Sequence, residues 1–117
     1  MSELHFDTDR LPEALIARPA GDIDMAGTPR IQADVLAAVS DHAAGCLVMD
    51  LSSASYIDSS GIELLFRLHG ALSGDGVELI VVAPDGSNAA RLLGLVALND
   101  IGEVRRSLAE ALDRCGS

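Results

Sequence analysis

The amino-acid sequence predicts an α/β protein with a mixed, mainly parallel sheet of four to five strands and about four helices. Short apolar runs of strand length alternate with longer segments in which apolar residues recur at helical spacing. Clusters of glycine, proline and serine separate these segments, as expected for turns. Such alternation is typical of right-handed crossovers between parallel strands. With 117 residues, about half of them apolar, we expect one domain over residues 1–117.

The N-terminal segment is expected to form two paired strands. Residues 4–8 form a weak strand, residues 9–12 a turn, and residues 14–20 a second strand. The second strand is expected to end at Pro19 to Gly21, because proline cannot donate to a strand ladder. The short connection allows antiparallel pairing, which places the first strand at one side of the sheet.

The next segment predicts a helix followed by a buried strand. Thr28 and Pro29 have the residue types of an N-cap and a first helical position. The helix is expected to end near residues 41–45. Residues 46–51 then form a strand that is apolar without alternation, as in a sheet covered by helices on both faces.

The second half of the chain continues the alternation. We expect a helix break at 73–76, a strand at 77–83, a short helix at 88–95 that buries Val96, and a brief strand at 101–104. Ser107 and Glu110 have the spacing of a capping box, which predicts the start of a last helix.

The most informative stretch lies between the strand at 46–51 and a long helix. Residues 52–58 are expected to form a loop, and apolar residues recur at helical spacing from Gly61 to Leu72. Asp58 or Ser59 can cap this helix, because either side-chain oxygen can accept from a free amide of the first turn. The residue that does not cap is left facing water.

The run from Asp58 to Gly61, Asp-Ser-Ser-Gly, resembles the signature of the STAS domain (sulphate transporter and anti-sigma factor antagonist), in particular of bacterial anti-sigma factor antagonists. Residues 21–24 are similar to the Gly-Glu-Leu-Asp of that family, residues 48–52 to its central strand and residues 91–112 to its C-terminal segment. The resemblance therefore covers almost the whole chain. Two residues depart from the family pattern, Ala97 in place of a frequent glycine and Pro19 in place of a strand residue.

This resemblance implies a STAS fold and a phospho-switch without enzymatic activity. The first serine of the tetrad is the phosphorylation site in the family, and it is Ser59 here. The unphosphorylated protein is expected to bind an anti-sigma factor that is also a serine kinase, and so to release the sigma factor. Phosphorylation ends this binding and a serine phosphatase restores it. The expected partner-binding residues are Asp24, Asp58, Ser60 and Gly61.

Each of these residues also has a plain structural interpretation. Ser59 can be a helix cap, and Asp58 fits a cap better than a group that orients the metal of a kinase-bound nucleotide. Ser60 fits a first-turn residue better than a second acceptor. Asp24 can be a solvated loop residue, and Gly61 can be required by tight packing rather than by the approach of a partner.

Two other functions are compatible with parts of this sequence. The alternative is a structural STAS subunit of a lipid-transport ABC system or of a stress-signalling scaffold, without serine phosphorylation. The intact tetrad favours the phospho-switch, because a pure docking subunit has no need of an acceptor hydroxyl. A catalytic role for Ser59 is disfavoured, since no Gly-x-Ser-x-Gly elbow surrounds it and no histidine has the spacing of an obvious base.

Composition argues against several other classes of function. The net charge is -10, with 18 acidic residues, eight arginines and no lysine, so nucleic acid would be repelled and a Walker A loop cannot form. The histidines and cysteines do not form a zinc pattern. Asp22, Asp24, Asp50 and Asp58 fit separate carboxylates better than a cation site. We therefore expect no metal and no cofactor.

The two cysteines and the N-terminus indicate the cellular compartment of the protein. Cys46 and Cys115 are expected to be reduced structural residues of a cytoplasmic protein, with a disulfide as the less favoured alternative. The N-terminus has neither a basic segment nor an apolar run of signal-peptide type, and no apolar run approaches membrane-spanning length. We therefore expect no membrane partner.

Overall fold

The computed structural model describes residues 5–42, 44–94 and 102–115 of the chain. Its strands are β1 (His5–Arg10), β2 (Leu15–Ile23), β3 (Cys46–Asp50), β4 (Ala54–Ile57), β5 (Glu78–Val82) and β6 (Glu103–Arg105). Its helices are α1 (Thr28–Asp41), α2 (Ser59–Gly74), α3 (Asn88–Leu93) and α4 (Leu108–Cys115). The predicted α/β class is confirmed, and the described residues contain six strands in one sheet.

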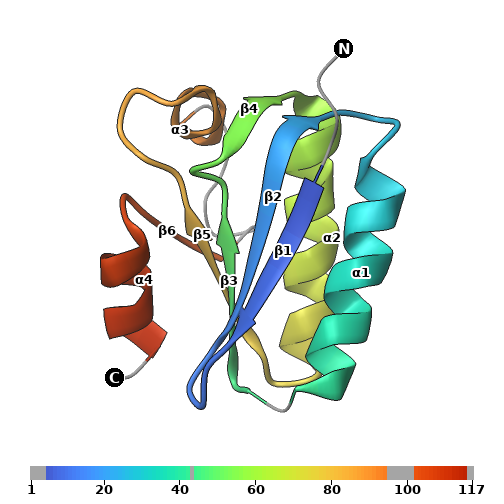
Figure 1. Cartoon of the computed structure of the whole chain (residues 1–117), viewed down its shortest axis with the longest axis vertical. Coiled ribbons are helices and arrows are strands. Elements are labelled where there is room, and N and C mark those ends of the chain that lie inside the picture. The colour runs from blue at the N-terminus through green and yellow to red at the C-terminus, as the bar shows by residue number, and fades with distance from the viewer. Residues whose placement is uncertain (1–4, 43, 95–101, 116–117) are drawn as a thin grey trace.

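The sheet is mixed and mainly parallel, as predicted. Its order is β1-β2-β3-β5-β6, and β4 pairs with β2 beyond the end of β3. β1 is antiparallel to β2 at the edge of the sheet, whereas the other pairs are parallel. Parallel strands bring their carboxyl ends to one end of the sheet, so the loops that follow β2 and β4 lie together at the same end of the molecule (Figure 1).

The expected end of the second strand at Pro19 to Gly21 is wrong, because β2 continues to Ile23. Pro19 pairs with Phe6 of β1 on one side. On the other side it lies between the stretch of β2 that pairs with β3 and the stretch that pairs with β4. The Gly21 N–H donates to Ser53 O on that side, so the Pro19 nitrogen points into the gap, where no ladder bond is needed. The expected turn at 9–12 is also too early, since β1 runs to Arg10.

The segment over residues 52–58 is not the loop that the sequence predicts. It contains β4, in which two of the four residues are exposed and the pattern shows no buried alternation. β4 exists because β2 extends past β3 and offers it a parallel partner, with Ile23 opposite Ile57. Such pairing depends on a strand far away in the sequence, which a local pattern does not encode.

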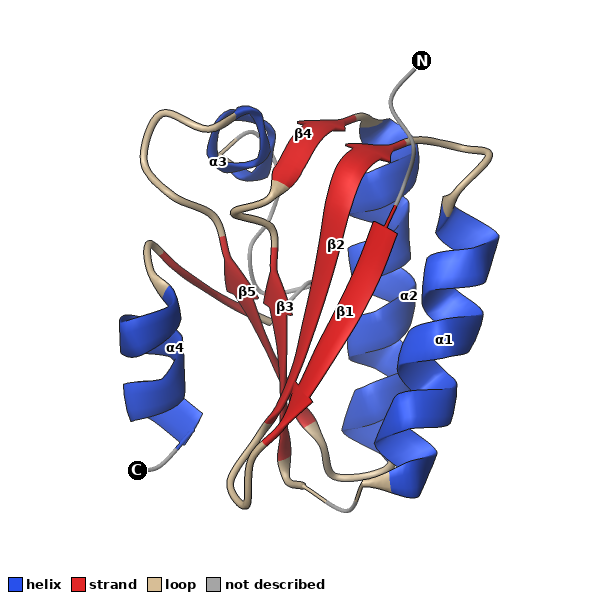
Figure 2. Ribbon diagram, in the orientation of Figure 1, coloured by secondary structure: helices blue, strands red, loops and turns tan. Residues whose placement is uncertain are grey.

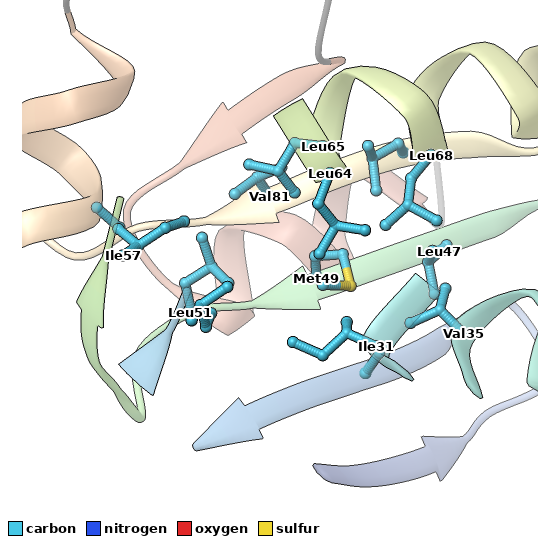
Figure 3. Packing of buried hydrophobic residues seen from close by; sticks show 14 of the residues in the cluster. Ile31, Val35, Leu47, Met49, Leu51, Ile57, Leu64, Leu65, Leu68 and Val81 are labelled. Atoms are coloured by element: carbon cyan, nitrogen blue, oxygen red, sulfur yellow. The ribbon is translucent and has the colours of Figure 1, made fainter. Parts of the chain in front are cut away.

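Helices cover the two faces of the sheet unequally. Figure 2 shows α1 and α2 on one face and α4 on the other. The first face buries the larger core, which includes Ile31, Met49 and Leu64 and is shown in Figure 3. The second face buries a smaller group that includes Ile16, Val48 and Ala111.

The expectation of two reduced cysteines is wrong in this structure. Cys46 and Cys115 form a disulfide that joins β3 to α4, with their Cα atoms 5.9 Å apart. The two residues are 69 positions apart in the sequence, and only the docking of α4 on the smaller core brings them together. Arg114 adds ion pairs to Glu78 at 2.7 Å and to Glu103 at 3.0 Å.

The helix boundaries follow the predictions closely, with one corrected cap. Ser107 caps α4, and its Oγ accepts from Glu110 N–H at 3.2 Å. Thr28 is not the cap of α1, because Gly27 occupies that position and Thr28 is the first helical residue. The predictions for Leu4, residues 95–101 and Ala97 lie outside the described residues. Among the described helices, none is long and apolar enough to cross a membrane.

Candidate functional site at the start of α2

The predicted site residues meet where β2 and β4 end and α2 begins. Asp58 N–H donates to Ile23 O at 3.3 Å, which continues the pairing of the two strands by one residue. Asp24 and Asp58 therefore each follow directly on a strand at the same end of the sheet. The sequence predicted both residues but not the pairing that brings their segments side by side.

Asp58 is the cap of α2. Its carboxylate accepts from Ser60 N–H at 2.9 Å and from Gly61 N–H at 3.4 Å. Ser59 is the first residue of the helix and is exposed, whereas Ser60 is half-buried. Because the carboxylate performs the capping, the Ser59 hydroxyl is not needed for it. The phospho-acceptor role of Ser59 remains a prediction.

Asp24 shapes the loop between β2 and α1. Its carboxylate accepts from Ala26 N–H at 3.1 Å and from Gly27 N–H at 3.2 Å. The side chain is half-buried rather than fully solvated. This turn fixes the loop beside the start of α2, and the partner-binding role of Asp24 stays a prediction.

Gly61 is buried against the ends of both strands. A Cβ atom at this position would collide with the Ile57 side chain and would lie 3.1 Å from Ile23 Cγ2. Tight packing therefore explains this glycine without a partner. It also keeps the first turn of α2 close to β2 and β4.

Asp50 does not belong to this site. It is buried at 3% exposure and accepts from Arg18 Nε at 3.1 Å and from Ser52 N–H at 3.0 Å. The hydrogen bond to Asp50 raises the pKa of Arg18, against the opposing effect of burial. Among the described residues, no group of three or more histidines, cysteines or acidic residues is arranged to hold a metal ion.

Sequence reasoning missed three residues near this site. Asn88, the first residue of α3, accepts from Ile57 N–H through its Oδ1 at 2.8 Å. Met25 and Tyr56 are large apolar side chains with exposures of 76% and 49%. The exposure of Met25 could have been predicted, because it follows Asp24 in the expected loop. For Asn88, nothing in the local sequence indicates a contact with β4.

The shape of the site suits a protein partner. Two hollows, of about 480 and 430 Å³, share Gly76, which lies in the loop after α2, and Ser73 near the end of α2 lines the first of them. Ser59, the first residue of α2, lies at the other end of that helix and is exposed. An exposed primary hydroxyl on a rigid helix start can enter the active site of a second protein.

A family model for the STAS domain matches residues 5–111. This chain belongs to the STAS domain family. Its fold is similar to that of an anti-sigma factor antagonist from Mycobacterium paratuberculosis, with a TM-score of 0.76 and 21% identity over 98% of this chain and 96% of the other. It is also similar to the phosphorylated form of the Bacillus cell fate determinant SpoIIAA, with a TM-score of 0.68 and 21% identity over 94% and 98% of the two chains.

A more distant part of the family is also similar in sequence. The chain is 39% identical over 70 residues to sulfate transporter 2.1 of Arabidopsis thaliana, which covers 59% of this chain. The matched region is 10% of the length of the transporter. STAS domains thus occur both as small anti-sigma factor antagonists and within much larger proteins.

Proposed function

We propose that this STAS domain is an anti-sigma factor antagonist that acts as a phospho-switch and has no enzymatic activity of its own. The unphosphorylated form binds an anti-sigma factor that is also a serine kinase, and the sigma factor is released. The kinase then transfers the γ-phosphate of ATP to Ser59, which ends the binding. A serine phosphatase returns the protein to its active form. The proposal places the protein in the cytoplasm, where sigma factors act.

The observation that carries this proposal is the exposed Ser59 at the first position of α2, with Asp58 as the cap. In the transfer step, the Ser59 oxygen forms the new bond to phosphorus and ADP leaves. The hydroxyl proton passes to a base that the kinase supplies. Asp24, Asp58 and Ser60 are the proposed contacts around the acceptor, and Gly61 contributes through the backbone of the first turn.

Electrostatics favour repulsion at the interface over unfolding as the basis of the switch. A phosphoserine carries about -1.5 to -2 charges, and a helix N-terminus stabilises negative charge by about 0.3 to 1 kcal/mol, so α2 tolerates the modification. At ~5 Å and an effective dielectric constant of ~20, each pair of like charges across an interface costs about 3 kcal/mol, roughly a hundredfold in affinity. In the proposed complex the like charges on the partner side are a carboxylate of the kinase or the phosphates of its bound nucleotide.

Phosphotransfer with the cognate serine kinase tests the proposal. After incubation with the kinase and ATP, we expect one phosphate per chain, located on Ser59 by peptide mass spectrometry. Ser59→Ala should take up none, and the matched variant Ser60→Ala should take up one. Full labelling of Ser60, or of Ser59→Ala, would overturn the assignment.

The transporter relative supports a second candidate function, a STAS domain that docks on a larger assembly without phosphorylation. The larger assembly in this alternative is a lipid-transport ABC system or a stress-signalling scaffold. In that case Ser59→Ala would leave partner binding and its regulation unchanged. The same set of variants therefore separates the two functions.

A further inference from the structure

The amide of Ile57 is a buried donor at an edge of the sheet. β4 pairs with β2 on one side, and Asp58 N–H donates to Ile23 O on that side. Successive backbone N–H groups of a strand point to opposite edges. The Ile57 N–H therefore points away from β2, and Ile57 is only 2% exposed. Without a partner, this donor would lose its hydrogen bond with water and gain nothing in return.

Asn88 supplies the missing acceptor. Its Oδ1 lies 2.8 Å from the Ile57 nitrogen, although the two residues are 31 positions apart. Asn88 is the first residue of α3, which lies beside β4 in Figure 1. Ala89 and Leu93 anchor this helix in the larger core, so the carboxamide is held on a fixed element.

The backbone is thus clamped from both edges directly before the proposed acceptor. α3 holds the Ile57 N–H, and β2 holds the Asp58 N–H. The Ile57 side chain packs against Gly61 in the first turn of α2. Ser59 follows Asp58 immediately, so the hydrogen bonds of the Ile57 and Asp58 amides hold the backbone that carries its hydroxyl.

We infer that Asn88 is a positioning residue that sets the place of the Ser59 hydroxyl through β4. The inference rests on the proposed function of Ser59 as a phospho-acceptor. Phosphoryl transfer depends on alignment of the attacking oxygen, and small displacements reduce the rate strongly. Loss of the Asn88 contact should slow the transfer step, whereas the outer surface that docks on the kinase stays in place.

Hydrogen exchange at single amides tests the contact without any kinase. Asn88→Leu keeps the approximate shape of the side chain and removes the acceptor, so the Ile57 amide should exchange roughly tenfold faster. Asn88→Asp retains an oxygen at this position and should restore the protection. Ser87→Ala is the matched control, because it removes the cap of α3 at Ala90 N–H and leaves the Asn88 oxygen in place.

Steady-state phosphorylation by the kinase tests the consequence. For Asn88→Leu we expect kcat to fall about three- to tenfold with KM within about twofold of wild type. Asn88→Asp should recover most of the rate, and Ser87→Ala should keep the wild-type kcat. Asn88→Leu and Ser87→Ala both destabilise α3, so a fall in kcat in Asn88→Leu alone separates positioning of Ser59 from a general loss of stability.

Three results would overturn the inference. They are unchanged exchange of the Ile57 amide in Asn88→Leu, an equal loss of kcat in Asn88→Leu and Ser87→Ala, and failure of Asn88→Asp to restore protection. If the kinase does not phosphorylate wild-type Ser59, the proposed function fails. Ile57 exchange then still decides whether Asn88 holds β4.

Discussion

The helices α2 and α4 lie on opposite faces of the sheet and both begin beside a serine, yet the two serines are used differently. Ser107 is the cap of α4, and its Oγ accepts from Glu110 N–H and contacts Glu110 Oε2 at 3.4 Å. Ser59 comes after the cap of α2, because Asp58 binds the free amides of the first turn. One hydroxyl is engaged in the fold and the other is exposed.

The difference follows from how each helix is held. α2 buries six residues along one side, Gly61, Ile62, Leu64, Leu65, Leu68 and Leu72. α4 buries only Ala111 fully and packs Leu108 and Leu112 partly against the smaller core, so the Ser107 cap and the Arg114 and Cys115 links at its two ends add to a small apolar face. A helix with a large apolar face can present its first turn to a partner, whereas a helix with a small face needs its cap for stability.

The largest expected effect is the loss of the disulfide at the end of α4. A cross-link over 69 residues stabilises a protein by about 2 to 4 kcal/mol, mainly by restricting the unfolded chain. Reduction should therefore lower the free energy of unfolding by about this amount in denaturant titrations. Hydrogen exchange should rise first in α4 and last in the core-facing turns of α2.

The double variant Cys46→Ala, Cys115→Ala is the control for that experiment. Its stability should not respond to a reductant, and it should resemble the reduced wild type. Equal denaturant midpoints for reduced and oxidised wild type would show that packing and ion pairs alone hold α4.

A negative charge at Ser59 gives the next largest effect, and the same charge at Ser107 is its control. Ser59→Asp should weaken binding to the anti-sigma partner by about one to two orders of magnitude, since a single exposed charge has part of the effect of a phosphate. The melting midpoint of Ser59→Asp should stay within a few degrees of wild type, which corresponds to a change of less than about 1 kcal/mol in the free energy of unfolding. Ser107→Asp, on the opposite face, should leave the affinity unchanged. Titration and melting of the same preparations check this, and a collapse of the midpoint in Ser59→Asp would mean that the switch is conformational.

Removal of each hydroxyl gives the smallest effect and tests the comparison most directly. Ser107→Ala should cost about 1 kcal/mol of stability, as expected for the loss of an N-cap. Ser59→Ala should change stability by less than about 0.5 kcal/mol, because Asp58 keeps the cap. Equal losses in the two variants, measured by urea unfolding, would contradict the assignment of the caps.

Local spacing in the sequence was sufficient where the contact partners are close along the chain. The Ser107–Glu110 pair predicted the start of α4, and the break at 73–76 predicted the end of α2 near Gly74. Two possible caps were left for α2, because Asp58 and Ser59 are both good N-cap residues. For α1, Gly27 rather than Thr28 is the cap, because the loop before it is closed by the Asp24 carboxylate.

The sequence by itself determined the α/β class, the long helix at the tetrad and the acidic surface, since periodicity and charge are properties of the local chain. The tertiary structure alone decided which residues meet from afar. β2 passes Pro19 because β3 and β4 leave a gap there, and β4 forms because β2 reaches it. The Ile57–Asn88 contact and the Cys46–Cys115 bond join residues 31 and 69 positions apart. Their partners are chosen by packing of the whole sheet, which no short stretch of sequence contains.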